Sequence, residues 1–284
     1  MGGIYIYFYA STLQFQKFVA HTKKIETFKL LANGDLASSS DQNDVKIHTN
    51  TCSLLQTYSV HTAIVYGLEQ IDSDTMASGS ADGLIHIWSI STGARLRFLN
   101  NNSPNVRVLK KLSSGLLASG IDSSSNNILI WNPITGSLVS TLNAHTGGVL
   151  CLEVLDSQYF ASGSVDSTVI IWDLTGSGTT KFILKSHLTD VVALSRVSSC
   201  RLASGSKDGV IIVWDWTNGQ LVHTLVGHTN AMSLDYYNED ILVSGSLDKT
   251  LIIWNLTSGS LIQNYAINLE ITALVLTNTR KCYA

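Results

Sequence analysis

Histidine, serine and aspartate, the residue types of one hydrolytic triad, recur along this chain at nearly constant spacing. In four stretches an Asp lies 20 or 21 residues after a His, and a Trp follows six residues after that Asp. The four sets are His61, Asp82 and Trp88; His145, Asp166 and Trp172; His187, Asp208 and Trp214; and His228, Asp248 and Trp254. An active site is normally built once, whereas this arrangement is built four times. We therefore expect a structural role for these residues, with no catalytic residues and no enzyme activity.

The same histidines could suggest a metal site. Each belongs to a separate stretch with its own Asp, so no three of them can converge on one ion. The 21 glycines form neither a G-x-x-x-x-G-K-[ST] loop nor a helix-opening G-x-G-x-x-G. We expect no metal and no cofactor. Four cysteines without C-x-x-C spacing predict free thiols in a reducing, cytoplasmic compartment.

Charge and hydropathy exclude two further classes of partner. Eighteen Lys and Arg against 21 Asp and Glu give a net charge of −3, which lacks the basic surplus of a nucleic-acid-binding domain. No window approaches the roughly 18 consecutive apolar residues that a membrane-spanning helix needs. We therefore expect neither nucleic acid nor a membrane as a partner.

An internal repeat defines the elements that must position these residues. The sequence Met-Ala-Ser-Gly-Ser-Ala-Asp at 76–82 and its counterpart Phe-Ala-Ser-Gly-Ser-Val-Asp at 160–166 each precede a Trp. Successive Trp positions lie 40 to 43 residues apart, which is the period of a four-stranded propeller blade. Within each period, short runs of Val, Ile and Leu alternate with Gly, Asn, Asp and Ser clusters about every ten residues. The pattern predicts an all-β domain.

These features resemble the WD-repeat β-propeller family. Trp172-Asp173 and Trp214-Asp215 supply the dipeptide that names the family, and Gly227-His228 supplies the Gly-His that opens a repeat. The resemblance implies that the Trp N–H, a Ser hydroxyl, the His and the Asp of each repeat form one buried hydrogen-bonded tetrad. Two serines in each repeat, such as Ser78 and Ser80, could supply that hydroxyl.

Two repeats depart from the family pattern. The repeat at 36–48 has His48 in the Trp position, and the repeat at 117–131 lacks the His. We expect these two blades to be less rigid than the others.

The chain ends align with the two halves of one further repeat. Residues 4–21 match a second half and residues 271–284 match a first half. Joined in one sheet, they would close the ring without open edges. We therefore expect a single propeller domain, residues 1–284, of seven four-stranded antiparallel blades. The blade cores are expected at 22–58, 62–99, 103–142, 146–184, 188–225 and 229–266, with a composite closing blade made of 267–284 plus 1–20.

A binding site is expected on the face of the disc that carries the inter-blade His loops. The resemblance implies that partners bind around the central channel there, through residues three and five positions after the His and one before the Asp. Tyr66 and Arg107 come from adjacent blades at the same depth, and an aromatic residue beside an Arg is enriched in interface hot spots. The candidate partner-binding residues are Tyr66, Arg107, Lys24, Glu26, Asp190, Lys207, Glu270, Leu150 and Leu247.

Three functional interpretations follow. The first is a non-catalytic protein–protein interaction scaffold that binds a peptide or protein partner and is itself monomeric within a larger complex. The second is an adaptor or substrate-recognition domain of a longer protein, for example a ubiquitin ligase or a signalling component. The third, and least favoured, is a propeller enzyme, for which Lys24 and Glu26 with Asp190 and Lys207 are all that the sequence offers.

Overall fold

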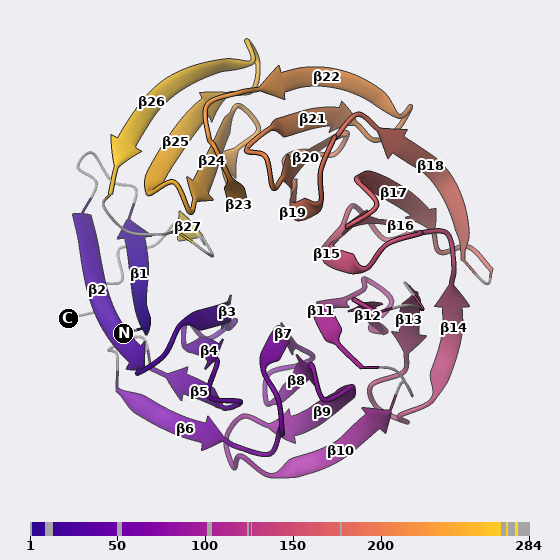
Figure 1. Cartoon of the computed structure of the whole chain (residues 1–284). Coiled ribbons are helices and arrows are strands. Elements are labelled where there is room, and N and C mark those ends of the chain that lie inside the picture. The colour runs from indigo at the N-terminus through magenta and orange to yellow at the C-terminus, as the bar shows by residue number, and fades with distance from the viewer. Residues whose placement is uncertain are drawn as a thin grey trace.

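Every regular element that the structure describes is a β strand. The computed structural model describes residues 2–8, 14–49, 53–100, 104–123, 125, 127–176, 178–267, 271 and 276–277. The strands form six four-stranded sheets and one three-stranded sheet. The sheets stand around a central opening as the blades of a propeller (Figure 1). The all-β propeller predicted from the repeat is confirmed.

Each four-stranded blade is an antiparallel meander whose strands follow the chain from the channel to the rim. Blades 1 to 3 consist of β3 (Ile25–Leu30), β4 (Leu36–Ser40), β5 (Val45–His48) and β6 (Leu54–Tyr58); β7 (Val65–Gln70), β8 (Thr75–Ser80), β9 (Leu84–Ser89) and β10 (Arg95–Asn100); and β11 (Val106–Lys111), β12 (Leu117–Ile121), β13 (Ile128–Trp131) and β14 (Leu138–Leu142). Blades 4 to 6 consist of β15 (Val149–Val154), β16 (Tyr159–Ser164), β17 (Thr168–Asp173) and β18 (Thr179–Lys185); β19 (Val191–Arg196), β20 (Arg201–Ser206), β21 (Ile211–Asp215) and β22 (Gln220–Leu225); and β23 (Ala231–Asn238), β24 (Ile241–Ser246), β25 (Thr250–Asn255) and β26 (Ser260–Ala266).

The apolar core lies between neighbouring blades. The second strand of each blade carries Leu-Ala-Ser-Gly or a close variant of it, with Ser39 in place of the Gly in blade 1, and is buried along almost its whole length. Its glycine is required by close approach, since a Cβ on Gly79 would lie 2.5 Å from Cγ1 of Val106 on the next blade. One core cluster joins Leu184 of blade 4 to Leu202 and Trp214 of blade 5. Blade-to-blade packing therefore fixes the orientation of every inner strand around the channel.

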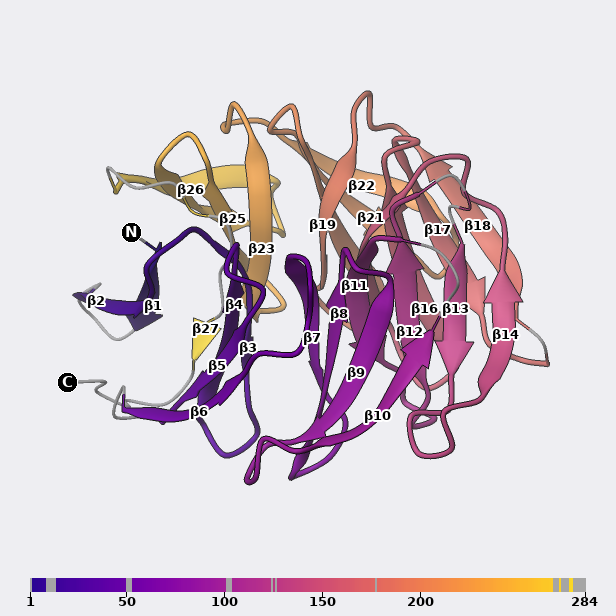
Figure 2. The ribbon, with the colours of Figure 1, turned by 60° about the horizontal axis from the view of Figure 1, so that its bottom comes forward.

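The prediction of seven four-stranded blades is wrong. The structure has six such blades, and the chain ends form a three-stranded sheet in the order β2 (Gln14–His21), β1 (Gly2–Phe8) and β27 (Leu276–Thr277). Figures 1 and 2 show this sheet between blade 6 and blade 1.

The pairing within this sheet explains the difference from a complete blade. β1 and β2 pair antiparallel, as the third and fourth strands of a blade do, but β27 pairs with β1 in parallel. The first and third strands of a meander run in the same direction, so they form a parallel ladder when they pair directly. Residues 281–284, which were expected to begin the intervening strand, lie outside the described residues.

Candidate functional site

Blades 4 and 6 contain a complete hydrogen-bonded chain of Trp, Ser, His and Asp. In blade 4, Trp172 Nε1 donates to Ser162 Oγ at 2.7 Å, and Ser162 Oγ lies 2.7 Å from His145 Nε2. His145 Nδ1 in turn lies 2.8 Å from Asp166 Oδ2. The corresponding distances in blade 6, along Trp254, Ser244, His228 and Asp248, are 2.8, 2.7 and 3.0 Å. These hydrogen bonds connect the loop before the first strand to the third strand of the same blade.

The structure distinguishes the two serines that the sequence left open. In blades 4, 5 and 6 the first serine of the pair accepts from the Trp; these serines are Ser162, Ser204 and Ser244. The second serine bonds to the backbone of the loop and of the turn: Ser164 Oγ donates to the Gly147 carbonyl at 2.8 Å and accepts from the Asp166 N–H at 3.1 Å. Blades 2 and 6 repeat this arrangement through Ser80 and Ser246.

The tetrad carboxylates stay ionised although they are partly buried. Burial alone would raise the pKa of Asp82, but hydrogen bonds from the His61 ring and from the backbone N–H groups of Thr62 and Leu84 lower that pKa to about 2. Asp248 also has a pKa of about 2, since the hydrogen bonds it accepts from Thr250, from the Thr229 N–H and from His228 outweigh its burial. Each of these carboxylates therefore fastens a turn to a loop at neutral pH.

Blade 2 lacks the last link of the expected tetrad. The Trp88 ring stacks on Tyr58 at 4.7 Å, and Trp88 Nε1 has no hydrogen-bond partner among the described residues. His86 lies two residues earlier on β9; its ring stacks on His61 at 4.3 Å, and its Nδ1 lies 2.9 Å from the Tyr58 hydroxyl. The tetrad prediction is therefore wrong for Trp88, while Asp82 and His61 keep their bond of 2.9 Å.

Blade 5 lacks the opposite link. Trp214 Nε1 donates to Ser204 Oγ at 2.8 Å, and Ser204 Oγ lies 2.7 Å from His187 Nε2. His187 Nδ1, however, has no partner among the described residues, and Asp208 accepts from Ser206 Oγ at 2.5 Å. The prediction that His187 binds Asp208 is wrong. Burial lowers the pKa of His187 to about 4.

The two divergent repeats keep parts of the arrangement. In blade 1, Gln42 stands in the Asp position, and Asp44 Oδ1 instead lies 3.4 Å from His21 Nδ1. Burial lowers the pKa of His48, in the Trp position, to about 4. In blade 3, Trp131 Nε1 donates to Ser119 Oγ at 2.9 Å although the blade has no His.

One residue of the innermost strand of each blade, at the end next to the His loop, lies at a β-bulge. In every blade the register of the first strand against the second shifts by one residue, which leaves one residue without a partner across the ladder. These residues are Glu26, Tyr66, Arg107, Leu150, Val192 and Met232. Bulges re-aim side chains, and those of blades 1 to 5 lie on the strands nearest the channel (Figure 1).

Tyr66 and Arg107 meet near the channel. The guanidinium carbon of Arg107 lies 4.2 Å from the centroid of the Tyr66 ring, a cation–π arrangement between blades 2 and 3. Both side chains are partly exposed, and neither belongs to a tetrad. Leu150 and Leu247 are also partly exposed.

The charged candidates pair within their own blades. Lys24 Nζ lies 2.8 Å from Glu26 Oε1, and Lys207 Nζ lies 3.6 Å from Asp190 Oδ2. Both lysines are exposed, and such surface pairs contribute about 0–1 kcal/mol to stability. Glu270 lies outside the described residues.

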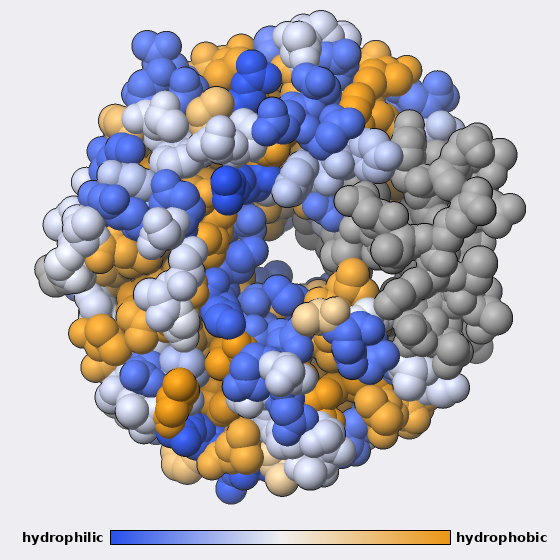
Figure 3. All heavy atoms as spheres, turned by 180° about the vertical axis from the view of Figure 1, so that it is seen from behind, coloured by the Kyte–Doolittle hydropathy of each residue, from blue (hydrophilic) through white to orange (hydrophobic). Residues whose placement is uncertain are grey.

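A second ring of polar residues lies deeper in the channel, and the sequence analysis missed it. These residues follow the bulges by three positions and pair across the ladder with an Ala of the second strand, or with Val243 in blade 6; they are Lys29, Glu69, Lys110, Glu153, Ser195 and Asp235. Hydrophilic residues border much of the central opening that Figure 3 shows in colour. The alternation of Lys and Glu at this position of successive repeats is the signal that could have revealed the ring.

Ion pairs in this ring connect neighbouring blades. Lys29 Nζ lies 2.8 Å from Glu69 Oε2, and Lys110 Nζ lies 2.5 Å from Glu153 Oε2. Burial opposes the charge of Lys110, but the carboxylates of Glu153, Glu69 and Asp235 outweigh it and raise the pKa of Lys110. The ring therefore couples blade 1 to blade 2 and blade 3 to blade 4 electrostatically.

Among the described residues we looked for a metal site and for a membrane-spanning helix. No three His, Cys, Asp or Glu side chains there gather in a way that could hold a metal ion. No helix long and apolar enough to cross a membrane occurs in that part of the chain.

Comparison with known proteins agrees with the geometry. The family model "WD domain, G-beta repeat" matches residues 52–89, 136–173, 178–215 and 219–255, which together exceed half of the chain. A search of the curated proteins found no significant match. Among solved structures, the crystal structure of the computationally designed Ika8 protein is similar, with a TM-score of 0.79 and 26% identity over 98% of this chain and 85% of that one. The chain therefore belongs to the WD-repeat family.

Proposed function

We propose that this propeller is a non-catalytic scaffold that binds a peptide or protein partner on the channel face carrying the His loops. WD-repeat propellers are generally protein-interaction scaffolds, which supports a role in binding proteins. The proposed placement of the binding site rests on the Tyr66–Arg107 pair, in which a planar cation lies 4.2 Å from an aromatic ring near the channel. Aromatic and Arg side chains dominate the energetics of protein interfaces.

The surroundings of the pair suit a peptide-binding surface. The next bulge position around the channel carries Leu150, and the paired charges of Lys24 with Glu26 lie on the blade before Tyr66. Apolar and aromatic groups would bind the partner, while exposed charges such as Lys207 would influence the rate and orientation of association. We place the protein inside the cell, because Cys151 and Cys200 are both free thiols. We further propose that it acts as a monomer within a larger complex.

The experiment has two stages. Affinity capture with the intact chain, followed by mass spectrometry, identifies a partner; titration calorimetry then compares Tyr66→Ala plus Arg107→Ala with the native protein. We expect the double variant to lose at least about 2 kcal/mol of binding free energy. The matched control is Asn218→Ala plus Ser258→Ala, in exposed turns at the opposite end of β21 and β25, which should leave binding unchanged. Loss of binding in the turn pair with retention in the Tyr66/Arg107 pair would rule out this placement.

A further inference from the structure

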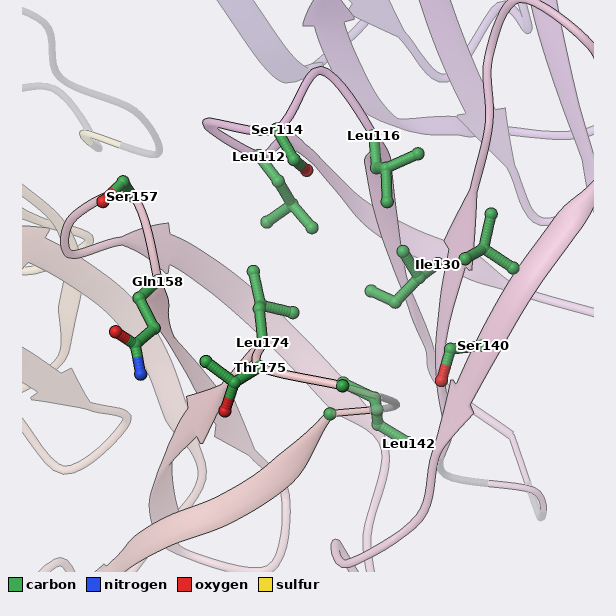
Figure 4. A pocket seen from close by; sticks show the side chains of 13 residues that line it. Leu112, Ser114, Leu116, Ile130, Ser140, Leu142, Ser157, Gln158, Leu174 and Thr175 are labelled. Carbon is green, nitrogen blue, oxygen red and sulfur yellow. The ribbon is translucent and has the colours of Figure 1, made fainter.

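A cavity of about 310 Å³ lies between blades 3 and 4, away from the His loops and the channel. Leu112 and Leu116, from the turn that joins β11 to β12, face Leu174 of blade 4 across the opening in Figure 4. Ile130 and Leu142 of blade 3 complete the apolar lining, and Ser140 and Gln158 lie at its polar edges. An apolar cavity of about 150 Å³ suffices to bind benzene in an engineered protein, so this space is large enough for an aromatic ring.

The junction between blades 4 and 5 shows which side chain fills the corresponding space there. The residue that follows β17 in blade 4 is Leu174, and the residue that follows β21 in blade 5 is Trp216. Trp216 is only 3% exposed and packs between blades 4 and 5. Its indole lies 5.7 Å from the Tyr159 ring and 5.4 Å from Lys181 Nζ.

Strand register identifies the counterparts of these residues around the cavity. Leu116 corresponds to Tyr159, because each accepts the backbone N–H of the residue that follows the inner strand. Ser140 corresponds to Phe182, since each pairs with the residue before the blade's Trp. Val139 corresponds to Lys181, as each is the extra residue of the bulge on the outer strand. Three neighbours and the central residue are thus all smaller at the blade 3–4 junction, and the cavity is the space that they leave.

Junctions with a central aliphatic residue are closed elsewhere in the chain. Leu256, the counterpart of Leu174 in blade 6, is fully buried, and Arg201 Nη1 donates to its carbonyl at 3.1 Å. Ile90 in blade 2 is 6% exposed. Leu174, by contrast, is only partly buried although its side chain faces other leucines. A leucine at this position therefore does not by itself leave a cavity.

We propose that the cavity between blades 3 and 4 binds an indole-sized aromatic ring from outside the chain, in the position that Trp216 occupies between blades 4 and 5. The ring lies against Leu112, Leu116 and Leu174 and removes their apolar surface from water. The proposal is independent of the partner site at Tyr66 and Arg107, which lies on the channel. The ring belongs to a small aromatic molecule or to a Trp side chain of a peptide.

Titration calorimetry and protein NMR with two probes, free indole and N-acetyltryptophanamide, test the proposal. We expect indole to bind the native protein and to shift the methyl signals of Leu112, Leu116 and Leu174. Binding of N-acetyltryptophanamide as well would assign the ring to a peptide, and binding of indole alone would assign it to a small molecule. No binding of either probe up to millimolar concentration would overturn the proposal.

Variants that fill the cavity with a larger side chain of the protein itself test whether the ring binds there. Leu174→Trp should weaken indole binding at least tenfold without lowering the melting temperature, since a Trp side chain closes the same junction in the next blade. If Leu174→Trp does not fold, Ser140→Phe tests the same expectation at a second wall of the cavity. Asn218→Ala, in a remote exposed turn, should bind indole as the native protein does. Unchanged affinity in a folded filling variant would place the ring elsewhere and refute the proposal.

Discussion

The guanidinium of Arg107 lies 4.2 Å above the ring of Tyr66, and each residue is the unpaired member of a bulge in its own blade. The bulges leave both residues without a cross-strand partner, and the stacking holds their side chains together. A cation–π pair at a partly exposed site contributes about 0.5–1 kcal/mol. The pair therefore organises a surface more than it stabilises the fold.

A double-mutant cycle on this pair gives the first prediction. Tyr66→Ala and Arg107→Ala should each lower the free energy of unfolding by less than about 1 kcal/mol, with a coupling of about 0.5–1 kcal/mol. Urea unfolding followed by tryptophan fluorescence measures all four corners of the cycle. Arg107→Lys is the matched control, since it keeps the charge and loses the planar stacking. A coupling of zero would show that the two side chains do not hold each other in solution.

The second prediction compares two tryptophans at the same position of the repeat. Trp172→Phe removes the indole N–H that Ser162 accepts, and we expect a loss of about 1–3 kcal/mol of unfolding free energy from the stranded group. Trp88→Phe removes an N–H without a partner among the described residues, so it should cost less. Thermal and urea denaturation of both variants decide the matter. Equal losses would mean that the Ser162 bond contributes nothing specific.

The blade positions were predictable from the sequence because a repeat fixes strand register. Once each His, Asp and Trp is aligned, Tyr66 and Arg107 must lie at the same depth on adjacent inner strands. The broken tetrad of blade 2 was harder to foresee, since it depends on His86, a residue outside the motif. His86 takes the place beside His61, and Trp88 stacks on Tyr58 instead of reaching the serine.

Features made by several repeats together could not be predicted from any single motif. The cavity at Leu174 results from four smaller side chains, of which none is unusual alone. The closing sheet failed as a prediction because alignment shows which halves of a repeat are present but not how they pair. β27 pairs directly with β1, whereas the alignment placed a second strand between them.

The third prediction concerns acid destabilisation. Burial lowers the pKa of His187 from 6.5 to about 4, so between these pH values the unfolded chain takes up a proton that the folded chain does not. Stability is therefore present above pH 6.5 and is lost as the pH falls toward 4. His187→Gln removes the titrating group while an amide remains near Ser204. We expect its unfolding free energy to vary less with pH over this window than that of the native protein.

A lower pH window separates this effect from that of the carboxylates. Asp82 and Asp248, with pKa values of about 2 against an ordinary 3.8, lose their stabilisation only as the pH falls through that interval. Urea unfolding at half-unit steps from pH 7 to pH 4 isolates the histidine contribution. Parallel curves for the native protein and His187→Gln would contradict it.

The fourth prediction concerns the ring of charges deep in the channel. Lys110→Met leaves Glu153 without its partner in a partly buried site, and we expect a loss of about 1–3 kcal/mol of unfolding free energy, less than for a fully buried pair. Lys110→Met combined with Glu153→Met removes both charges and should be less destabilised than Lys110→Met alone. Strictly additive losses would show that the two residues do not interact energetically.

The fifth prediction rests on the contact between a glycine of one blade and a valine of the next. A Cβ on Gly79 would lie 2.5 Å from Cγ1 of Val106, which is fully buried, so Gly79→Ala overpacks the junction. Overpacking of this kind costs about 1–3 kcal/mol. Val106→Ala creates the opposite defect, a small cavity at the same place. The two changes together place a methyl group where another was removed, so the double variant should lose less stability than the sum of the single losses.

A matched control separates local rescue from a general effect of truncating a valine. Val149 holds the corresponding position at the next junction, where a Cβ on Gly120 would lie 2.8 Å from its Cγ1. Gly79→Ala with Val149→Ala combines two defects at different junctions, and its losses should add within about 0.5 kcal/mol. Urea unfolding measures the three single and two double variants on one scale. If Val149→Ala rescues Gly79→Ala as strongly as Val106→Ala does, the contact between Gly79 and Val106 is not the reason why position 79 requires a glycine.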